Sequence, residues 1–288
     1  MKIAVFGQTY KTESLPYIID LLQLLLANKI EITLFNELQE LVNQNISISF
    51  DSFNSSDDLS ADIDLMISVG GDGTMLQAAN IIQDAAIPVI GINTGRLGFL
   101  ATVPKNAIQS AVEQLISGDY QIKERSLLQV TTGENSKAFF ALNEISVSRK
   151  NSTTMITIDT YINDQYLNTY WADGLIVATP TGSTGYSLSC NGPIIAPDVQ
   201  ALSITPIAPH NLSIRPLIIR DDAQLKLQIK SRENHFLLAM DSHVESIHTH
   251  SEIYIQKAAF ELQMIELPNQ SFYKTLREKL LWGKDNRN

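Results

Sequence analysis

The fold class is decided by residues 65–79, LMISVGGDGTMLQAA. Residues 65–69 form a short apolar run that is typical of a buried strand. A helix-like pattern begins at Met75, and three glycines, Gly70, Gly71 and Gly73, provide the turn between strand and helix. A strand that runs through a tight turn into a helix is the first half of a βα unit. The segment therefore predicts an α/β fold with a parallel sheet.

The same turn suits a phosphate group. Its glycines allow the backbone to approach a ligand closely, and the N-terminus of the following helix attracts an anion. The Asp72 carboxylate would repel that phosphate unless it accepts a proton from an attacking hydroxyl or binds a metal ion that bridges phosphates. The alternative is a tight turn in which Asp72 caps the next helix. The five-residue run from Gly70 to Thr74, placed at the end of a strand, favours the phosphate site.

The first hundred residues alternate strand-like and helix-like segments around this turn. Strands are expected at 2–6, 31–35, 65–69 and 89–92, and helices at 15–27 and 74–84. A further helix is expected at 106–118. The remainder is rich in β-branched residues and turns, as at 157–162 and 166–170 around Asn163-Asp164, which predicts antiparallel strands.

The chain ends on an amphipathic pattern at 271–282, with Phe272, Leu276 and Leu280 at helical spacing. This helix needs a surface to pack on, and the α/β domain is the expected one. We therefore predict two domains. Residues 1–100 with 268–288 form a Rossmann-like α/β domain that carries the phosphate loop, and residues 101–267 form a mainly antiparallel, sandwich-like β domain.

Composition limits the classes of function. The 288 residues carry 21 basic and 31 acidic side chains, and the formal charge of -10 argues against nucleic acid or a membrane surface as partner. A small phosphorylated ligand remains compatible with this charge, because backbone N–H groups can bind it. Cys190 is the single cysteine, and the most apolar stretch is interrupted by polar residues. We therefore expect a cytoplasmic protein without a membrane span.

Three later elements make the sequence similar to a known family. They are Asn93–Leu100 (NTGRLGFL), the pair Asn143-Glu144, and residues 173–175 (DGL) followed by 179–189 (TPTGSTGYSLS). The glycine turn alone is shared by NAD, diacylglycerol, sphingosine and phosphofructo-kinases. In order and spacing, all the elements together resemble the NAD kinases, and the resemblance runs from Ile3 to Trp282.

The resemblance implies an enzyme that phosphorylates the 2′-hydroxyl of the adenosine ribose of NAD with ATP and produces NADP. It implies that Asp72 is catalytic, that Asn143 and Glu144 bind the adenosine portion, and that Asp173 accepts from the nicotinamide carboxamide. The phosphate donor loop would be Gly70, Gly71, Gly73 and Thr74. The residues expected to bind NAD are Asp72, Gly73, Asn143, Glu144, Trp171, Asp173, Thr184, Gly185, Tyr186, Ser187, Leu188, Ser189, Ala208 and His243.

The chemistry of Asn143 and Glu144 agrees with this role. They interrupt a strand-like run at 139–147, where a polar pair is costly to bury unless it is hydrogen-bonded. A ligand can supply the partners, because an amide both donates and accepts and a carboxylate accepts from hydroxyls. The alternative is a cross-strand pair satisfied by the backbone. Likewise, residues 179–189 are either a nucleotide-binding loop or an ordinary solvated loop.

The sequence departs from the family pattern at Gly185, commonly alanine, at Asn191, usually glycine, and at Trp171, often smaller or basic. Asn191 tolerates a positive φ better than most residues, so the turn there can be kept. His210, His235, His248 and His250 lack ligand spacing and are expected to be surface or core residues.

The loop has no evident lysine to neutralise a transferring phosphoryl group, which predicts a divalent metal ion such as Mg²⁺ without assigned protein ligands. The family resemblance also suggests a homo-oligomer, a dimer or tetramer. Two other functions compete: a lipid or sugar kinase with the same glycine turn, and a non-catalytic NAD(H) sensor. The choices between NAD and NADH, and between ATP and polyphosphate, remain open at this level.

Overall fold

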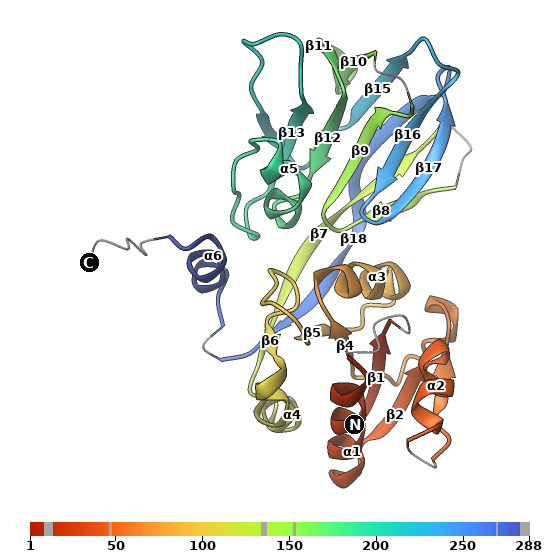
Figure 1. Cartoon of the computed structure of the whole chain (residues 1–288), viewed down its shortest axis with the longest axis vertical. Helices are drawn as coiled ribbons and strands as arrows, with labels where there is room; N and C mark the ends of the chain where they lie inside the picture. The colour runs from red at the N-terminus through yellow and green to blue at the C-terminus, as the bar shows by residue number, and fades with distance from the viewer. Residues whose placement is uncertain (9–13, 46–47, 134–136, 152–153, 269, 283–288) are drawn as a thin grey trace. The chain divides into compact units, whose positions relative to one another are not determined.

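The computed structural model describes residues 1–8, 14–45, 48–133, 137–151, 154–268 and 270–282, and Figure 1 labels the helices and strands. The chain divides into two compact units. Unit 1 is Met1–Glu124 with Leu262–Asn288, and unit 2 is Arg125–Glu261. Among the described helices, none has the length and apolar character needed to cross a membrane.

Unit 1 contains a parallel sheet in the order β18-β5-β4-β1-β2-β3, with β6 beside β5. Its central strands are buried along their length because helices pack on the sheet. The chain moves outward from β1 through β2 to β3, then returns to the other side of β1 for β4 and β5. The sheet strands are β1 (Lys2–Gly7), β2 (Glu31–Phe35), β3 (Asp51–Phe53), β4 (Leu65–Gly70), β5 (Val89–Asn93) and β6 (Val103–Pro104).

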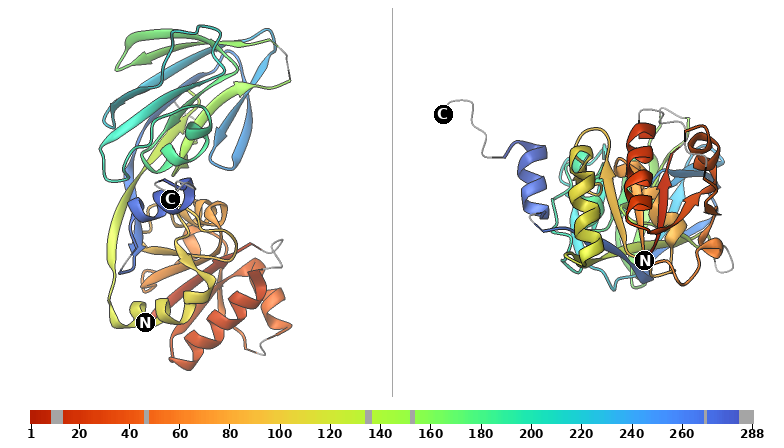
Figure 2. Two further views of the ribbon diagram at one scale, coloured as in Figure 1. Left: turned by 60° about the vertical axis from the view of Figure 1, so that its left-hand side comes forward. Right: turned by 90° about the horizontal axis from the view of Figure 1, so that it is seen from below.

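Two helices of unit 1, α1 (Leu15–Ala27) and α4 (Ile108–Ser117), lie side by side (Figure 2) and share one apolar core. This shared core explains why unit 1 continues past residue 100, where the sequence suggested a boundary. At the other end, unit 1 resumes at residue 262 rather than 268. Its other helices are α2 (Asn36–Asn43), η2 (Ser56–Asp58), α3 (Asp72–Ile82), η3 (Lys105–Ala107) and α6 (Phe272–Leu280).

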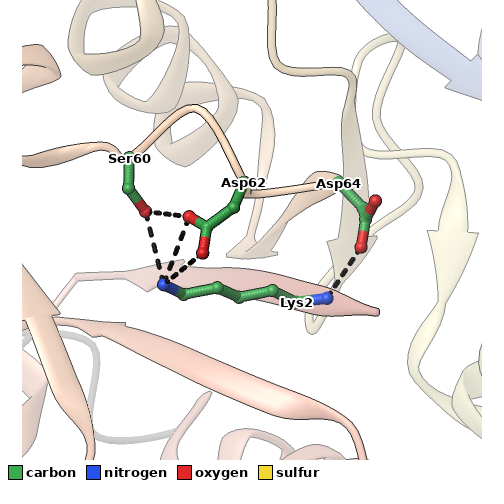
Figure 3. A network of polar contacts seen from close by, with 4 residues as sticks. All are labelled: Lys2, Ser60, Asp62 and Asp64. Atoms are coloured by element: carbon green, nitrogen blue, oxygen red, sulfur yellow. Dashed lines mark hydrogen bonds and ion pairs between the residues drawn. The ribbon is translucent and has the colours of Figure 1, made fainter.

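Lys2 ties the N-terminal ends of β1 and β4 together (Figure 3). Its backbone N–H donates to Asp64 at 2.7 Å, and its ammonium group contacts Ser60 and Asp62 at 3.2–3.3 Å. Ligands of parallel sheets bind at the opposite, carboxyl end of the strands. We therefore assign this network to the stability of the sheet.

Unit 2 is a sandwich of two sheets that enclose one apolar core. One sheet has the order β14-β13-β12-β9-β16-β17, and all its pairs are antiparallel. Figure 1 labels its strands from β13 to β17 in this order. The other sheet places β11-β10-β15-β18 side by side, with β7 and β8 also paired. The expected combination of a parallel α/β sheet with a β sandwich is confirmed.

Unit 2 contains strands β7 to β18, two of which extend into unit 1. The strands are β7 (Gln121–Thr131, which begins in unit 1), β8 (Phe139–Ala141), β9 (Glu144–Arg149), β10 (Ile156–Ile162), β11 (Gln165–Ala172), β12 (Gly174–Ala178), β13 (Ala201–Ile207), β14 (Leu217–Arg220), β15 (Leu225–Lys230), β16 (His235–Met240), β17 (His243–His248) and β18 (Glu252–Glu266, which ends in unit 1).

The hairpin predicted at Asn163-Asp164 is confirmed. Both residues have positive φ, 48° and 62°, as a two-residue turn between twisted strands requires. The C-terminal helix is also confirmed in unit 1. Ser271 caps α6 by accepting from the backbone N–H of Lys274, and Phe272 contacts Phe99, with 6.2 Å between ring centroids.

Candidate active site

The glycine turn of unit 1 lies where the strand order reverses. The carboxyl ends of β1 and β4 are neighbours, since Gly7 pairs with Val69, and the chain leaves these two strands toward opposite sides of the sheet. Such a switch point is the usual ligand site of a doubly wound sheet. Gly71 and Asp72 follow β4 directly and start α3, so the segment that decides the fold also occupies the expected binding position.

The glycines of the turn have different roles. A Cβ at Gly70 would overlap the Thr74 side chain, so this glycine permits tight packing of the turn. A Cβ at Gly71 or Gly73 would meet nothing within 4 Å. The backbone at these two positions is therefore accessible. The N–H of Gly71 donates to Thr74 Oγ1 at 3.3 Å and that of Thr74 to the Gly71 carbonyl oxygen at 2.9 Å, so the N–H groups of Asp72 and Gly73 are the ones left for a phosphate.

Asp72 does not cap α3 with its side chain. Instead its carboxylate accepts three backbone hydrogen bonds from the segment after β5. Phe99 donates to Oδ2 at 2.8 Å, and Leu100 and Ala101 donate to Oδ1 at 3.0 and 2.9 Å. An ionised carboxylate has about four acceptor positions. Oδ1 has used two and Oδ2 one, so Oδ2 keeps one position for another donor.

The segment that holds Asp72 is itself fixed by α6. The ring of Phe99 contacts the ring of Phe272, and the Lys279 ammonium group lies 4.9 Å from the Phe99 ring centroid. The side chain of Gln270, just before the helix, donates to the carbonyl oxygen of Thr102 at 3.4 Å. The C-terminal helix therefore stabilises the backbone that orients the Asp72 carboxylate.

The described residues do not form a protein cage for a metal ion. No three of their His, Cys, Asp or Glu side chains gather closely enough to hold one. Magnesium in kinases commonly takes one or two carboxylates and completes its shell with phosphate oxygens and water. A divalent ion would therefore have to obtain most of its ligands from the phosphate donor.

In unit 2, Asn143 and Glu144 lie at a break between β8 and β9, as their polarity predicted. The carboxylate of Asp241 accepts from the backbone N–H groups of Leu142, Asn143 and Glu144 at 2.8, 3.0 and 3.0 Å. The sequence analysis did not identify Asp241, although it lies two residues before the expected binding residue His243. The sequence feature that could have identified Asp241 is an acidic residue in a two-residue turn between two strands.

Glu144 is half-buried, but its Oε2 atom is fully buried and has no hydrogen-bond partner. Burial, reinforced by the nearby negative charge of Asp241, raises the pKa of Glu144 to about 7, while a backbone hydrogen bond from Tyr186 opposes the change. Burial also raises the pKa of Asp241 to about 6. A buried oxygen without a partner is costly as a carboxylate, so this burial favours the protonated form of Glu144.

Residues 179–189 form two short helical turns, η4 (Thr181–Thr184) and α5 (Tyr186–Ser189), rather than an open loop. Thr179 joins them to the Asn143 region, because its hydroxyl donates to the Leu142 carbonyl oxygen at 2.6 Å and its N–H to that of Asn143 at 2.9 Å. A Cβ on Gly185 would lie 2.7 Å from Glu144 Oε2. An alanine at position 185 would thus force Glu144 to move.

The expected binding residues of η4 and α5 differ in how far they are exposed to solvent. Tyr186 and Ser189 are exposed, Leu188 and Thr184 are half-buried, and Ser187 is buried with its hydroxyl 2.9 Å from that of Thr205. Ser187 therefore supports the turn from inside. Asn191 has a φ of 63°, which is the left-handed conformation that asparagine tolerates better than most residues.

Asp173 forms an ion pair with Arg149, whose Nε lies 3.1 Å from its Oδ1. Sequence inspection had not identified Arg149, and only the pairing of β9 with β12 places it beside Asp173. Trp171 is 52% exposed, and its ring centroid lies 4.4 Å from that of His210. Ala208 follows β13 with a φ of 43° and is exposed.

Tyr186 connects the two groups of polar residues in unit 2. Although Tyr186 is 46% exposed, partial desolvation of its phenol group raises its pKa, and the nearby Cys190, Asp173 and Glu144 add to the effect. Asp173 and Glu144 are therefore both close enough to interact with one side chain of α5. Unit 2 thus brings together Asn143, Glu144, Asp173, Gly185 and Tyr186.

The histidines lie on the surface. His243 stacks on Phe139, with 5.7 Å between ring centroids, and its Nε2 is 3.2 Å from Glu245. His235, His248 and His250 form a chain of ring contacts at 5.1–5.3 Å. His210 is also exposed. Within the described part of the chain, the five histidines are exposed and none belongs to a group of three possible metal ligands.

Comparison with known proteins identifies the two parts of the chain. Residues 3–120 match the model of the ATP-NAD kinase N-terminal domain, and residues 142–267 match that of the ATP-NAD kinase C-terminal domain. The NAD kinases of Flavobacterium psychrophilum and Christiangramia forsetii are 47% and 48% identical to this chain over 294 residues. Each comparison covers 100% of both proteins.

Solved structures support the fold. A yeast NADH kinase complexed with NADH has a TM-score of 0.90 and 23% identity, covering 99% of this chain and 89% of the yeast chain. An NAD kinase from Archaeoglobus fulgidus in complex with ATP has a TM-score of 0.78 and 23% identity, covering 98% and 99%. At this identity the likeness concerns the fold alone.

Proposed function

Because the chain belongs to the NAD kinase family, we propose that Asp72 is its general base, taking the proton from the 2′-hydroxyl of the adenosine ribose. The enzyme phosphorylates NAD with ATP and produces NADP. The full-length match to NAD kinases leaves no reason to retain a lipid or sugar kinase or a non-catalytic sensor. What remains to be assigned is the role of each residue.

One observation carries the assignment of Asp72. Three backbone N–H groups fix the carboxylate in one orientation and leave a single open acceptor position, on Oδ2. A base must be held within hydrogen-bond reach of the proton that it removes. The same aspartate starts α3 at the switch point of the sheet, where the helix N-terminus favours phosphate.

The proposed reaction is a direct transfer. The 2′-hydroxyl donates its proton to Oδ2 of Asp72 while its oxygen forms a bond to the terminal phosphorus of ATP. The bond between that phosphorus and the bridging oxygen breaks, and ADP leaves with the electron pair. The turn from Gly70 through Gly71 and Gly73 to Thr74 binds the donor phosphates through backbone N–H groups.

The residues of unit 2 bind the dinucleotide in this proposal. Glu144 offers a buried oxygen without a partner, and Asn143 offers an amide that donates and accepts. Asp173, oriented by Arg149, accepts from the carboxamide of the nicotinamide end. The other residues that we propose to bind NAD are, in unit 2, Trp171, Thr184, Gly185, Tyr186, Ser187, Leu188, Ser189, Ala208 and His243 and, in unit 1, Asp72 and Gly73.

We also propose that the enzyme uses a divalent metal ion, forms a homo-oligomer and is located in the cytoplasm. Mg²⁺ would accompany ATP and neutralise phosphate charge, since the described residues form no metal cage of their own. A homodimer or homotetramer follows from the family resemblance, and light scattering of the purified enzyme tests it. The single cysteine agrees with the reducing cytoplasm.

Asp72→Asn tests the base. The variant removes the base and the charge, so kcat should fall by about 10²–10⁴-fold while NAD still binds. Because an amide has only one acceptor oxygen, the variant also loses some of the hydrogen bonds from the backbone N–H groups of residues 99–101. Initial rates and NAD calorimetry should therefore be accompanied by thermal unfolding. Normal NAD binding with kcat within a fewfold of wild type would exclude Asp72 as the base.

A further inference from the structure

We infer that Asp241 is a positioning residue of the dinucleotide site, which holds the Asn143–Glu144 pair in its binding geometry. Asp241 acts through the backbone of residues 142–144. The inference rests on the proposed function, because it assumes that Asn143 and Glu144 bind NAD.

The contacts of Asp241 extend along the backbone of residues 142–144. Its Oδ2 accepts from the N–H of Leu142, and its Oδ1 accepts from the N–H groups of Asn143 and Glu144. Its own N–H donates to the Glu144 carbonyl oxygen at 3.0 Å. Hydrogen bonds to an ionised acceptor are stronger than those between neutral groups, so the three bonds define the local conformation.

The opposite side of the same backbone is held by Thr179. Its hydroxyl and its N–H donate to the carbonyl oxygens of Leu142 and Asn143. All three N–H groups and all three carbonyl oxygens of residues 142–144 therefore have partners within unit 2. The backbone needs nothing further, and the side chains of Asn143 and Glu144 are left to meet a ligand.

Asp241 is itself fixed. It is the first residue of the two-residue turn between β16 and β17, where Met240 pairs with His243, and its φ is 51°. Met240 also pairs with Ile145 of β9, directly beside the Asn143–Glu144 pair. A carboxylate on a tight turn of a central strand has little freedom, as positioning requires.

The charge of Asp241 provides a second effect that packing alone would not produce. The groups that influence Glu144 are the Asp241 carboxylate and the backbone of Tyr186, and Glu144 in turn acts on the Tyr186 phenol and the Cys190 thiol. Asp241 is the negative charge that raises the pKa of Glu144 after burial. Removing it should lower that pKa.

The test uses Asp241→Asn and Asp241→Gly in the full-length enzyme. Asparagine keeps one acceptor oxygen, and glycine keeps none, yet both tolerate the positive φ that alanine would not. Asp222→Asn is the matched control, because it removes one negative charge from the same unit at an exposed ion pair with Arg220. Initial rates are measured against NAD and against ATP, from about pH 5.5 to pH 9.

The expected result is a KM for NAD raised about 10- to 100-fold, more in the glycine variant, with the KM for ATP unchanged. In Asp241→Asn, the acid limb of kcat/KM for NAD should also move to lower pH. A KM for NAD within twofold of wild type in both variants would overturn the inference, as would an equal rise in both KM values.

Asn143→Ala distinguishes failure of the inference from failure of the proposed function. If it raises the KM for NAD while both Asp241 variants leave it unchanged, the dinucleotide assignment stands and the role of Asp241 is wrong. If Asn143→Ala also leaves the KM for NAD unchanged, the assignment of the pair is wrong. Should the glycine variant fail to fold, the asparagine variant decides.

Discussion

Gly98 lies so close to Asp72 that a side chain at position 98 would overlap the carboxylate. A Cβ on Gly98 would meet Oδ1, Cγ and Oδ2 of Asp72, with the last at 2.8 Å. The neighbouring residues 99–101 donate to that same carboxylate. Position 98 therefore controls how closely the backbone can surround the proposed base.

Gly98→Ala should move the Asp72 carboxylate while its charge is kept. We expect a loss of about 1–3 kcal/mol in the free energy of unfolding and a fall in kcat of up to about 10²-fold. Thermal unfolding and initial rates measure both effects. Gly95→Ala is the stability control, because its Cβ would meet only Asn93 Oδ1, at 3.8 Å. Equal stability of the two variants would contradict the prediction.

Asn143→Ala and Glu144→Ala should each raise the KM for NAD about 10-fold or more, because each removes a contact remote from the bonds that form and break. The KM for ATP in the same preparations is the internal control and should stay within twofold. A change in the KM for ATP alone would mean that the pair binds the phosphate donor.

Glu144→Gln should make stability less dependent on pH. The pKa of Glu144 is raised from 4.5 to about 7, so the folded protein binds this proton more tightly than the unfolded chain. The free energy of unfolding of the wild type therefore falls as pH rises from about 4.5 to 7. Glutamine has no such proton, so the variant should gain about 1–3 kcal/mol relative to wild type across this interval.

Denaturant unfolding of both proteins without NAD, at pH 5, 6, 7 and 8, measures this difference. A stability difference that stays constant over the four pH values would show that Glu144 titrates normally in the folded protein. Asp222→Asn again provides the surface control, since its carboxylate is exposed.

Formation of NADP should stop when divalent metal ions are removed. Among the described residues no metal cage exists, and the glycine turn contains no lysine. We expect the charge of the transferring phosphoryl group to be neutralised by a divalent ion that arrives with ATP. An assay with excess EDTA, followed by restoration with Mg²⁺, measures this dependence. Undiminished turnover in EDTA would exclude it.

Local patterns in the sequence predicted much of the fold. The bounds of α1 and β2 agree with the apolar periodicity, and the end of α4 agrees with Gly118, whose φ is 75°. Helix α2 was missed because it begins directly after β2 and has no capping side chain. These outcomes depend on neighbours within a few residues along the chain.

The contacts within the candidate site could not be predicted from local sequence patterns. Asp72 and Glu144 are recognisable from motifs, but their environment comes from residues far away in the sequence. Asp241 reaches Asn143, Arg149 reaches Asp173, and the partners of Asp72 begin at Phe99. Strand register and turn geometry create these contacts, and neither is visible in the spacing of a single segment.

The interrupted sequence of unit 1 also sets the order in which the protein can be completed on the ribosome. All residues of unit 2 have been synthesised when residue 261 is reached, whereas unit 1 still lacks residues 262–288. Those last residues include Phe272 and Lys279, which contact Phe99. A nascent chain can therefore finish the β sandwich first, and the backbone that binds Asp72 obtains the support of Phe272 and Lys279 only once those residues have been synthesised.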